Sequence, residues 1–106
     1  ADEKLISQVL INLIQNAMYA LSERHDRHIV LQAHLNKDRS AVLEVVDNGV
    51  GISKEEMDKI FIPFYSTREG GTGIGLAFAR QVMHLHRARM MVQSEVGMGT
   101  RFLLVF

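Results

Sequence analysis

Cysteine is absent from the 106-residue sequence, and Pro63 is its one proline. Without cysteine the chain has no disulfide framework, no thiol nucleophile and no thiolate metal site, a composition typical of a reducing compartment. Internal repeats and low-complexity segments are also missing, so no linker is evident. We therefore expect one domain spanning residues 1–106.

The chain also has no net charge. Twelve Lys and Arg residues balance twelve Asp and Glu residues, so no overall field attracts nucleic acid or an anionic membrane surface. No apolar run approaches ~20 residues and no signal peptide is visible. We expect a cytoplasmic domain that neither binds nucleic acid nor inserts into a membrane, and that recognises its ligand at a local site.

What is present is a regular alternation of helical and strand patterns. Apolar residues recur at spacings of three and four from Asp2, a plausible N-cap, to about Leu21, which predicts an amphipathic helix. Residues 28–35 and 41–47 favour a β-hairpin, and a second hairpin is predicted for residues 88–95 and 100–106. Because these turns join hairpin partners, an α+β two-layer sandwich with a mostly antiparallel sheet is the natural packing.

Two further helices are predicted between the hairpins. Ser53 and Glu56 form a capping box, which indicates a short helix from residue 54 to about 60. The next helix should run from about residue 73 to 86. Its predicted buried stripe consists of Ile74, Phe78, Val82 and Leu85.

Polar residues are spaced four apart on the first helix. Gln8, Asn12 and Asn16 therefore share a face beside its apolar stripe. A solvated polar face is the ordinary interpretation of such a row. The alternative is a magnesium site, because a carboxamide oxygen can complete the shell of a Mg²⁺ held mainly by phosphate and water.

The segment DNGVG, residues 47–51, follows a predicted strand directly. Asp, Asn and Gly are ordinary turn residues. A turn does not explain why Asp47 lies on the same face as Leu43 and Val45. A buried carboxylate there needs a donor, which the exocyclic amine of a purine can supply, and Gly49 and Gly51 would let a flat ring approach.

The segment GTGIGL, residues 71–76, opens the third helix. Free amides and the positive dipole end of a helix form an anion site, and glycine lets phosphates approach. The motif lacks the Lys-Ser/Thr of a P-loop and does not follow a strand. Upstream, the segment FIPFYSTREGG, residues 61–71, reads as a mobile loop in which Arg68 is either an exposed charge or a phosphate contact.

The five histidines show no metal-binding spacing. Only His84 and His86 lie close together, and they point to different helix faces. We expect all five to lie at the surface and no zinc site to form.

Taken together, the motifs resemble the catalytic and ATP-binding domain of bacterial sensor histidine kinases, within the family shared with gyrase, Hsp90 and MutL. The resemblance covers nearly the whole chain. It lies in the ordered segments NLIQNA (12–17), DNGVGI (47–52), FIPF (61–64), GTGIGL (71–76) and VGMGT (96–100).

This resemblance implies a mixed, mostly antiparallel sheet with three helices, binding Mg²⁺ and ATP or ADP. Asn16 would coordinate Mg²⁺, Asn12 would lie near the phosphates, and Asp47 would accept from the adenine amine. Residues 65–72 would form a lid over the nucleotide. The other residues placed at the nucleotide by the resemblance are Tyr19, Gly49, Gly51, Ile52, Phe64, Arg68, Thr72, Gly73, Ile74, Gly75, Leu76 and Thr100.

The resemblance also implies a reaction. ATP-hydrolysing members carry a glutamate base where this chain has Asn12, which cannot accept a proton, so transfer of the γ-phosphoryl group to a separate acceptor is favoured. In sensor kinases that acceptor is a histidine on a helical hairpin domain, expected to be absent from this chain.

The further partner would be a response regulator. The fragment is expected to be monomeric and its parent a homodimer, whose membrane anchoring stays open. The alternatives are a gyrase- or Hsp90-type ATPase and a non-catalytic nucleotide-binding regulator.

Two departures from the family pattern stand out. Tyr19 occupies a position where family members often carry a basic residue, which makes Arg68 more important. Arg87 and Ala88 replace a pair of glycines after the third helix. A left-handed conformation at either residue would cost ~1 kcal/mol or more.

Overall fold

The computed structural model describes residues 2–21, 25–65 and 75–106. Within these ranges the chain forms three helices and four strands in the predicted order. They are α1 (Glu3–Ala20), β1 (Ile29–Leu35), β2 (Ala41–Asp47), α2 (Lys54–Met57), α3 (Gly75–Leu85), β3 (Arg89–Glu95) and β4 (Gly99–Val105).

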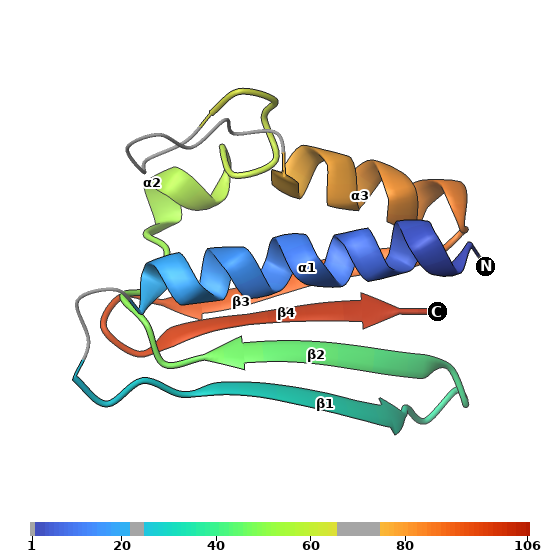
Figure 1. Cartoon of the computed structure of the whole chain (residues 1–106), viewed down its shortest axis with the longest axis horizontal. Helices are drawn as coiled ribbons and strands as arrows, with labels where there is room; N and C mark the ends of the chain where they lie inside the picture. Colours follow the sequence, from blue (N-terminus) through green and yellow to red (C-terminus); the bar gives the residue numbers. More distant parts are fainter. Residues whose placement is uncertain (1, 22–24, 66–74) are drawn as a thin grey trace.

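The strands form a sheet in the order β1-β2-β4-β3, and all three pairings are antiparallel. Both predicted hairpins are present, and β2 joins them by pairing with β4. Helices α1 and α3 lie side by side over one face of the sheet (Figure 1). The two-layer α+β prediction is confirmed.

The hydrophobic core lies between α1, α3 and the helix-facing side of the sheet. The residues Leu13, Met83 and Leu104 come from its three parts and are at most 1% exposed. The predicted stripe of α1 is buried as expected, since Val9, Leu13 and Ala17 all belong to the core cluster. Burial of such side chains supplies the main favourable free energy of folding, roughly 1.5–3 kcal/mol for each large aliphatic residue.

The start of α1 is tied to the end of α3. Asp2 is the N-cap, and its side chain accepts from the backbone amides of Lys4 and Leu5, as predicted. The backbone amide of Asp2 donates to Nε2 of His86 at 3.0 Å, while Nδ1 of His86 lies 2.8 Å from the carbonyl of Val82. These partners assign the proton to Nδ1. The expectation of five surface histidines is thus wrong for His86, which is partly buried and connects the two helices.

Two details of the predicted helices are wrong. Helix α2 begins after its Ser53 cap but ends at Met57 rather than near residue 60, because the chain continues in turns such as that from Lys59 to Glu56. The buried residues of α3 are Ala79, Val82 and Met83. Phe78 and Leu85 are 38% and 69% exposed, since α3 packs beside α1 as well as on the sheet, and the predicted Ile74 lies outside the described residues.

The end of α3 is strained at Arg87, where φ is 55°. The amide of Ala88 donates to the carbonyl of Met83, and the amide of Arg87 donates to that of His84. This pair of bonds is the Schellman motif, whose left-handed position is normally a glycine. The chain therefore carries a conformational cost at the position where the family pattern has glycine.

Replacing Arg87 by Gly should increase the free energy of unfolding by roughly 0.5–1 kcal/mol, because glycine adopts positive φ without strain. Urea denaturation of the two proteins measures the difference. Arg87→Ala is the matched control, since alanine removes the side chain but keeps the strain. An equal gain in both variants would show that the guanidinium, and not the backbone, is responsible.

Candidate functional site

A cavity of about 370 Å³ opens where α1 ends and β4 begins. Its walls come from α1, α2, the start of α3, the loop after β2, and β4. The lining residues are Asn12, Gln15, Asn16, Tyr19, Ala20, Asp47, Val50, Gly51, Ile52, Glu56, Ile60, Tyr65, Gly75, Leu76, Thr100 and Phe102.

The cavity brings together most of the residues predicted for the site. Those that line it are Asn12, Asn16, Tyr19, Asp47, Gly51, Ile52, Gly75, Leu76 and Thr100. Gly49 and Phe64 do not line it, and Phe64 is 80% exposed with φ at 70°. Arg68, Thr72, Gly73, Ile74 and most of the predicted lid lie outside the described residues.

Six lining residues were not predicted: Gln15, Ala20, Val50, Glu56, Ile60 and Phe102. Tyr65, the first residue of the predicted lid, also lines the cavity. Phe102 could have been found, because it follows Thr100 by two residues and so shares its face of the strand. Glu56 was assigned only to the capping box, yet it places a second carboxylate on the cavity. Ile60 was expected at the end of a helix that in fact stops at Met57, so its place on the cavity wall was not anticipated.

Asp47 supplies the buried charge of the cavity. It is 6% exposed, and Oδ1 accepts from the backbone amide of Gly49 at 2.8 Å. Burial raises the pKa of this carboxyl group above its ordinary value, although the amides of Gly49 and Thr100 act in the opposite direction. The predicted row of Leu43, Val45 and Asp47 on one face is confirmed, since Leu43 packs against the core and Val45 belongs to it.

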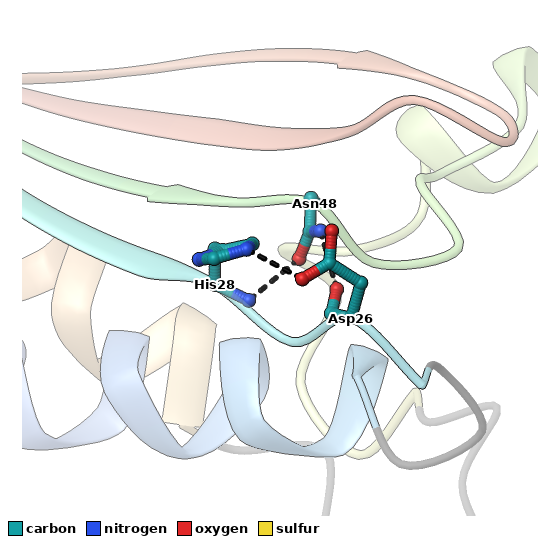
Figure 2. Close-up of polar contacts among 3 residues, drawn as sticks. All are labelled: Asp26, His28 and Asn48. Atoms are coloured by element: carbon teal, nitrogen blue, oxygen red, sulfur yellow. Dashed lines mark hydrogen bonds and ion pairs between the residues drawn. The ribbon is translucent and has the colours of Figure 1, made fainter.

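Asn48, the next residue of the DNGVG segment, does not line the cavity and has a structural role instead. Its Oδ1 accepts from the amide of His28 at 2.8 Å, and its Nδ2 donates to the carbonyl of Asp26 at 2.6 Å. Asp26 in turn contacts Nε2 of His28 at 2.6 Å, so the three residues form one cluster where β1 begins and β2 ends (Figure 2). Asn48 thereby fixes the direction of the chain directly after Asp47.

The glycines around Asp47 are required mainly by contacts between chain segments. A Cβ on Gly49 would lie 2.6 Å from the carbonyl oxygen of Ala20, and one on Gly51 would lie 2.2 Å from that of Glu95. A Cβ on Gly99 would lie 2.0 Å from the carbonyl oxygen of Asp47. The loop after β2 is therefore held between the end of α1 and the β3–β4 hairpin, which also donates from the amide of Gly97 to the carbonyl of Val50.

Gly75 differs from these glycines. A Cβ there would meet nothing closer than Cγ of Asn12, at 3.8 Å, which is ordinary contact. The described protein thus leaves room for a side chain at the first residue of α3. Since Gly75 lines the cavity, its missing side chain matters for what enters the cavity rather than for folding.

The two asparagines of α1 have different surroundings. Asn12 accepts from Nε2 of Gln8 at 3.0 Å and donates to the carbonyl of Gly75 at 3.2 Å, so its carboxamide joins α1 to α3. Asn16 lines the cavity one turn further on, and no described residue bonds to its carboxamide. It is the asparagine that can accept an external ligand.

No three His, Asp or Glu residues come together as a metal site within residues 2–21, 25–65 and 75–106. In the same part of the chain, no helix is both long enough and apolar enough to cross a membrane. The cavity accordingly combines the buried acid Asp47, the carboxamide of Asn16, to which no described residue bonds, and an apolar wall that includes Ile52, Leu76 and Phe102.

Comparison with known proteins assigns the family. Residues 1–106 match the family described as histidine kinase-, DNA gyrase B-, and HSP90-like ATPase. The chain therefore belongs to this family of ATP-binding domains, and ATP is the ligand class of its site.

Three proteins similar to this chain are named as histidine kinases or belong to structures of them. The signal transduction histidine-protein kinase AtoS of Escherichia coli K12 is 37% identical over 105 residues, covering 99% of this chain and 17% of AtoS. The nucleotide-free catalytic domain of histidine kinase ThkA matches with a TM-score of 0.82 and 30% identity, over 100% of this chain and 68% of that one. Full-length ShkA in complex with AMPPNP matches with a TM-score of 0.82 and 27% identity, over 99% of this chain and 22% of ShkA.

These matches confirm the resemblance and the fold. They also show that the chain spans about a sixth of AtoS, given its 17% coverage of that protein. The signals and phosphorylation targets of the full-length relatives are properties of those proteins.

The raised pKa of Asp47 predicts how stability depends on pH. The fold favours the neutral acid, so this contribution is fully present below the ordinary pKa of an unfolded aspartate, about 3.9, and is lost as the pH rises through the folded pKa. Wild type should therefore lose stability relative to Asp47→Asn as the pH rises.

Denaturant unfolding of both proteins at a series of pH values measures this difference. The exposed Asp38 offers a matched control, because Asp38→Asn changes an acid that is not buried. If wild type instead gained stability relative to Asp47→Asn with rising pH, the fold would favour the carboxylate.

Proposed function

We propose that this chain binds Mg²⁺-ATP and donates the γ-phosphoryl group to a histidine on a separate helical hairpin domain, as the kinase half of a two-component signalling protein. The observation that carries the proposal is the cavity itself, with Asp47 and Thr100 toward the sheet and Asn12, Asn16 and Gly75 along the helices. This arrangement provides one region for a nucleobase and another for phosphates.

The base region is suited to adenine. Asp47 is an acceptor with apolar side chains such as Ile52 and Phe102 in the same cavity. A planar base can bury its faces against the apolar wall while its exocyclic amine donates to the carboxylate. The AMPPNP complex of ShkA, a neighbour at 27% identity, supports an adenine nucleotide as the ligand.

The phosphate region is suited to the binding of a magnesium nucleotide. Asn16 has a carboxamide that no described residue occupies, and such an oxygen is an acceptable Mg²⁺ ligand. Because no acidic cluster is present among the described residues, the phosphates would supply most of the ligands. When bound, Mg²⁺ would neutralise charge on the phosphates.

Asn12 supports transfer rather than hydrolysis. An amide cannot take a proton from water, and both ends of this one are engaged, by Gln8 and by the carbonyl of Gly75. The role left to Asn12 is to hold the first turn of α3 against α1. Positioning of this kind is the main protein contribution to phosphoryl transfer.

The acceptor would be supplied by another domain of the parent protein. All five histidines of this chain are described, and none lines the cavity. The proposed system has two further parts. One is a hairpin that carries the acceptor histidine and through which the parent dimerises, and the other is a response regulator that receives the phosphoryl group. Arg68 and Tyr19 are proposed phosphate-side residues, together with the glycine-rich segment 71–74.

Transfer is tested by mixing the chain with γ-labelled ATP, Mg²⁺ and a sensor-kinase hairpin domain that carries the acceptor histidine. The expected result is acid-labile label on the hairpin, and none on a hairpin in which that histidine is replaced by Ala. Gly75→Ala should keep the wild-type melting temperature, because the Cβ has room. It should nevertheless transfer more slowly at low ATP concentration, since the methyl group occupies space needed by the phosphates.

Two results would contradict the proposal. Rapid multiple-turnover hydrolysis without label on the hairpin would assign the chain to the gyrase or Hsp90 type, with the carboxylate of Glu56 as the base to examine first. ATP binding without either reaction, even with the hairpin fused upstream, would indicate a regulatory nucleotide-binding module.

A further inference from the structure

Ser94 lies just behind the base region of the cavity. In the sheet it is paired with Thr100, and Thr100 is paired on its other side with Asp47. The three side chains therefore form one row across β3, β4 and β2. Thr100 and Asp47 line the cavity, whereas Ser94 does not.

The hydroxyl group of Ser94 makes three polar contacts. Its Oγ accepts from the backbone amide of Ile52 at 2.8 Å and donates to the carbonyl of Gly99 at 2.9 Å. It also lies 2.8 Å from Oγ1 of Thr100. A carbonyl can only accept and an amide can only donate, so these two contacts fix the direction of the serine proton.

The third contact is then determined as well. Ser94 has a single proton, which is used on Gly99, so Thr100 must be the donor in the bond between the two hydroxyl groups. The proton of Thr100 is held away from the cavity, and its oxygen presents only lone pairs there. Beside it lies the carboxylate of Asp47, which when ionised is also only an acceptor.

We infer that Ser94 is a positioning residue for base recognition: by fixing the hydroxyl proton of Thr100, it makes the base end of the cavity accept hydrogen bonds only, and so selects a purine with a 6-amino group over one with a 6-oxo group. This inference rests on the proposed function, because it requires the base of a nucleotide to lie against Asp47 and Thr100. A 6-oxo group there would face two acceptors and leave them without donors.

The experiment compares the affinities of Mg²⁺-ATP and Mg²⁺-ITP by calorimetric titration of the 106-residue chain. ITP carries an oxo group where ATP has the amine. Wild type should prefer ATP. In Ser94→Ala the hydroxyl of Thr100 is free to rotate and donate, so the ratio of the two affinities should fall between about twofold and tenfold, the size of one hydrogen bond.

Two further variants separate this role from a structural one. Thr100→Val should lower the ratio on its own, and adding Ser94→Ala to it should change the ratio no further, because Ser94 acts through Thr100. Ser94→Thr keeps a hydroxyl group and should restore the wild-type ratio. If Ser94→Ala fails to fold, the ratio of ATP to ITP affinity in Thr100→Val still tests the inference. An unchanged ratio in that variant overturns it.

Different results would overturn the proposed function and the role of Ser94. If wild type binds neither nucleotide, the proposed function is wrong. If wild type prefers ATP but Ser94→Ala weakens ATP and ITP equally, Ser94 only supports the loop at Ile52 and the inference is overturned. A fall in the ratio that persists with equal size in the Thr100→Val background also overturns it, because Ser94 would then act by another route.

Discussion

The rest of the site depends on one buried carboxylate. Asp47 ends an apolar row of β2 and is 6% exposed, so its charge must be compensated by donors that the fold or a ligand supplies. The protein gives it the amides of Gly49 and Thr100, yet burial still keeps the pKa of the group raised. A ligand that brings one more donor compensates the buried charge further. The same residue therefore destabilises the free protein when it is ionised and recognises the ligand in the bound one.

The surrounding glycines and Asn48 maintain the position of that carboxylate. Gly49 allows contact with the end of α1, Gly51 allows contact with Glu95, and Gly99 allows contact with the carbonyl of Asp47 itself. Asn48 holds the chain from the side of β1. The glycine-containing motifs that are far apart in the sequence thus pack against one another, and the cavity is formed by this packing. Gly75 is the exception, because among the described residues a Cβ there would meet nothing closer than Cγ of Asn12 at 3.8 Å.

The sequence was informative where one physical pattern dominates. The apolar period of α1, the capping role of Ser53 and the face shared by Val45 and Asp47 follow from local geometry, and the structure confirms them. The end of α2 and the packing of α3 depend on neighbouring elements, so the end of α2 and the burial of Phe78 and Leu85 were predicted wrongly, whereas Val82 is buried as predicted. Ser94 gave no signal, because a serine in a strand matters here only through residues paired with it across the sheet.

The burial of β1 also depends on neighbouring elements and could not be predicted from its own sequence. Its pattern predicted a hairpin, which formed, but Leu31 and Leu35 are 58% and 68% exposed. They belong to the edge strand, which α1 and α3 do not cover to the same extent as β2 and β4 (Figure 1). Strand propensity does not indicate which strand will be the edge.

The proposed function depends above all on recognition of the nucleotide base by Asp47. Calorimetric titration of Mg²⁺-ATP into wild type and into Asp47→Asn at neutral pH tests it most directly, with circular dichroism to confirm that the variant is folded. Saturable binding to wild type is expected, together with a loss of at least about tenfold in affinity in the variant, because an acceptor is replaced at a buried site. Equal affinity in the two folded proteins would contradict it.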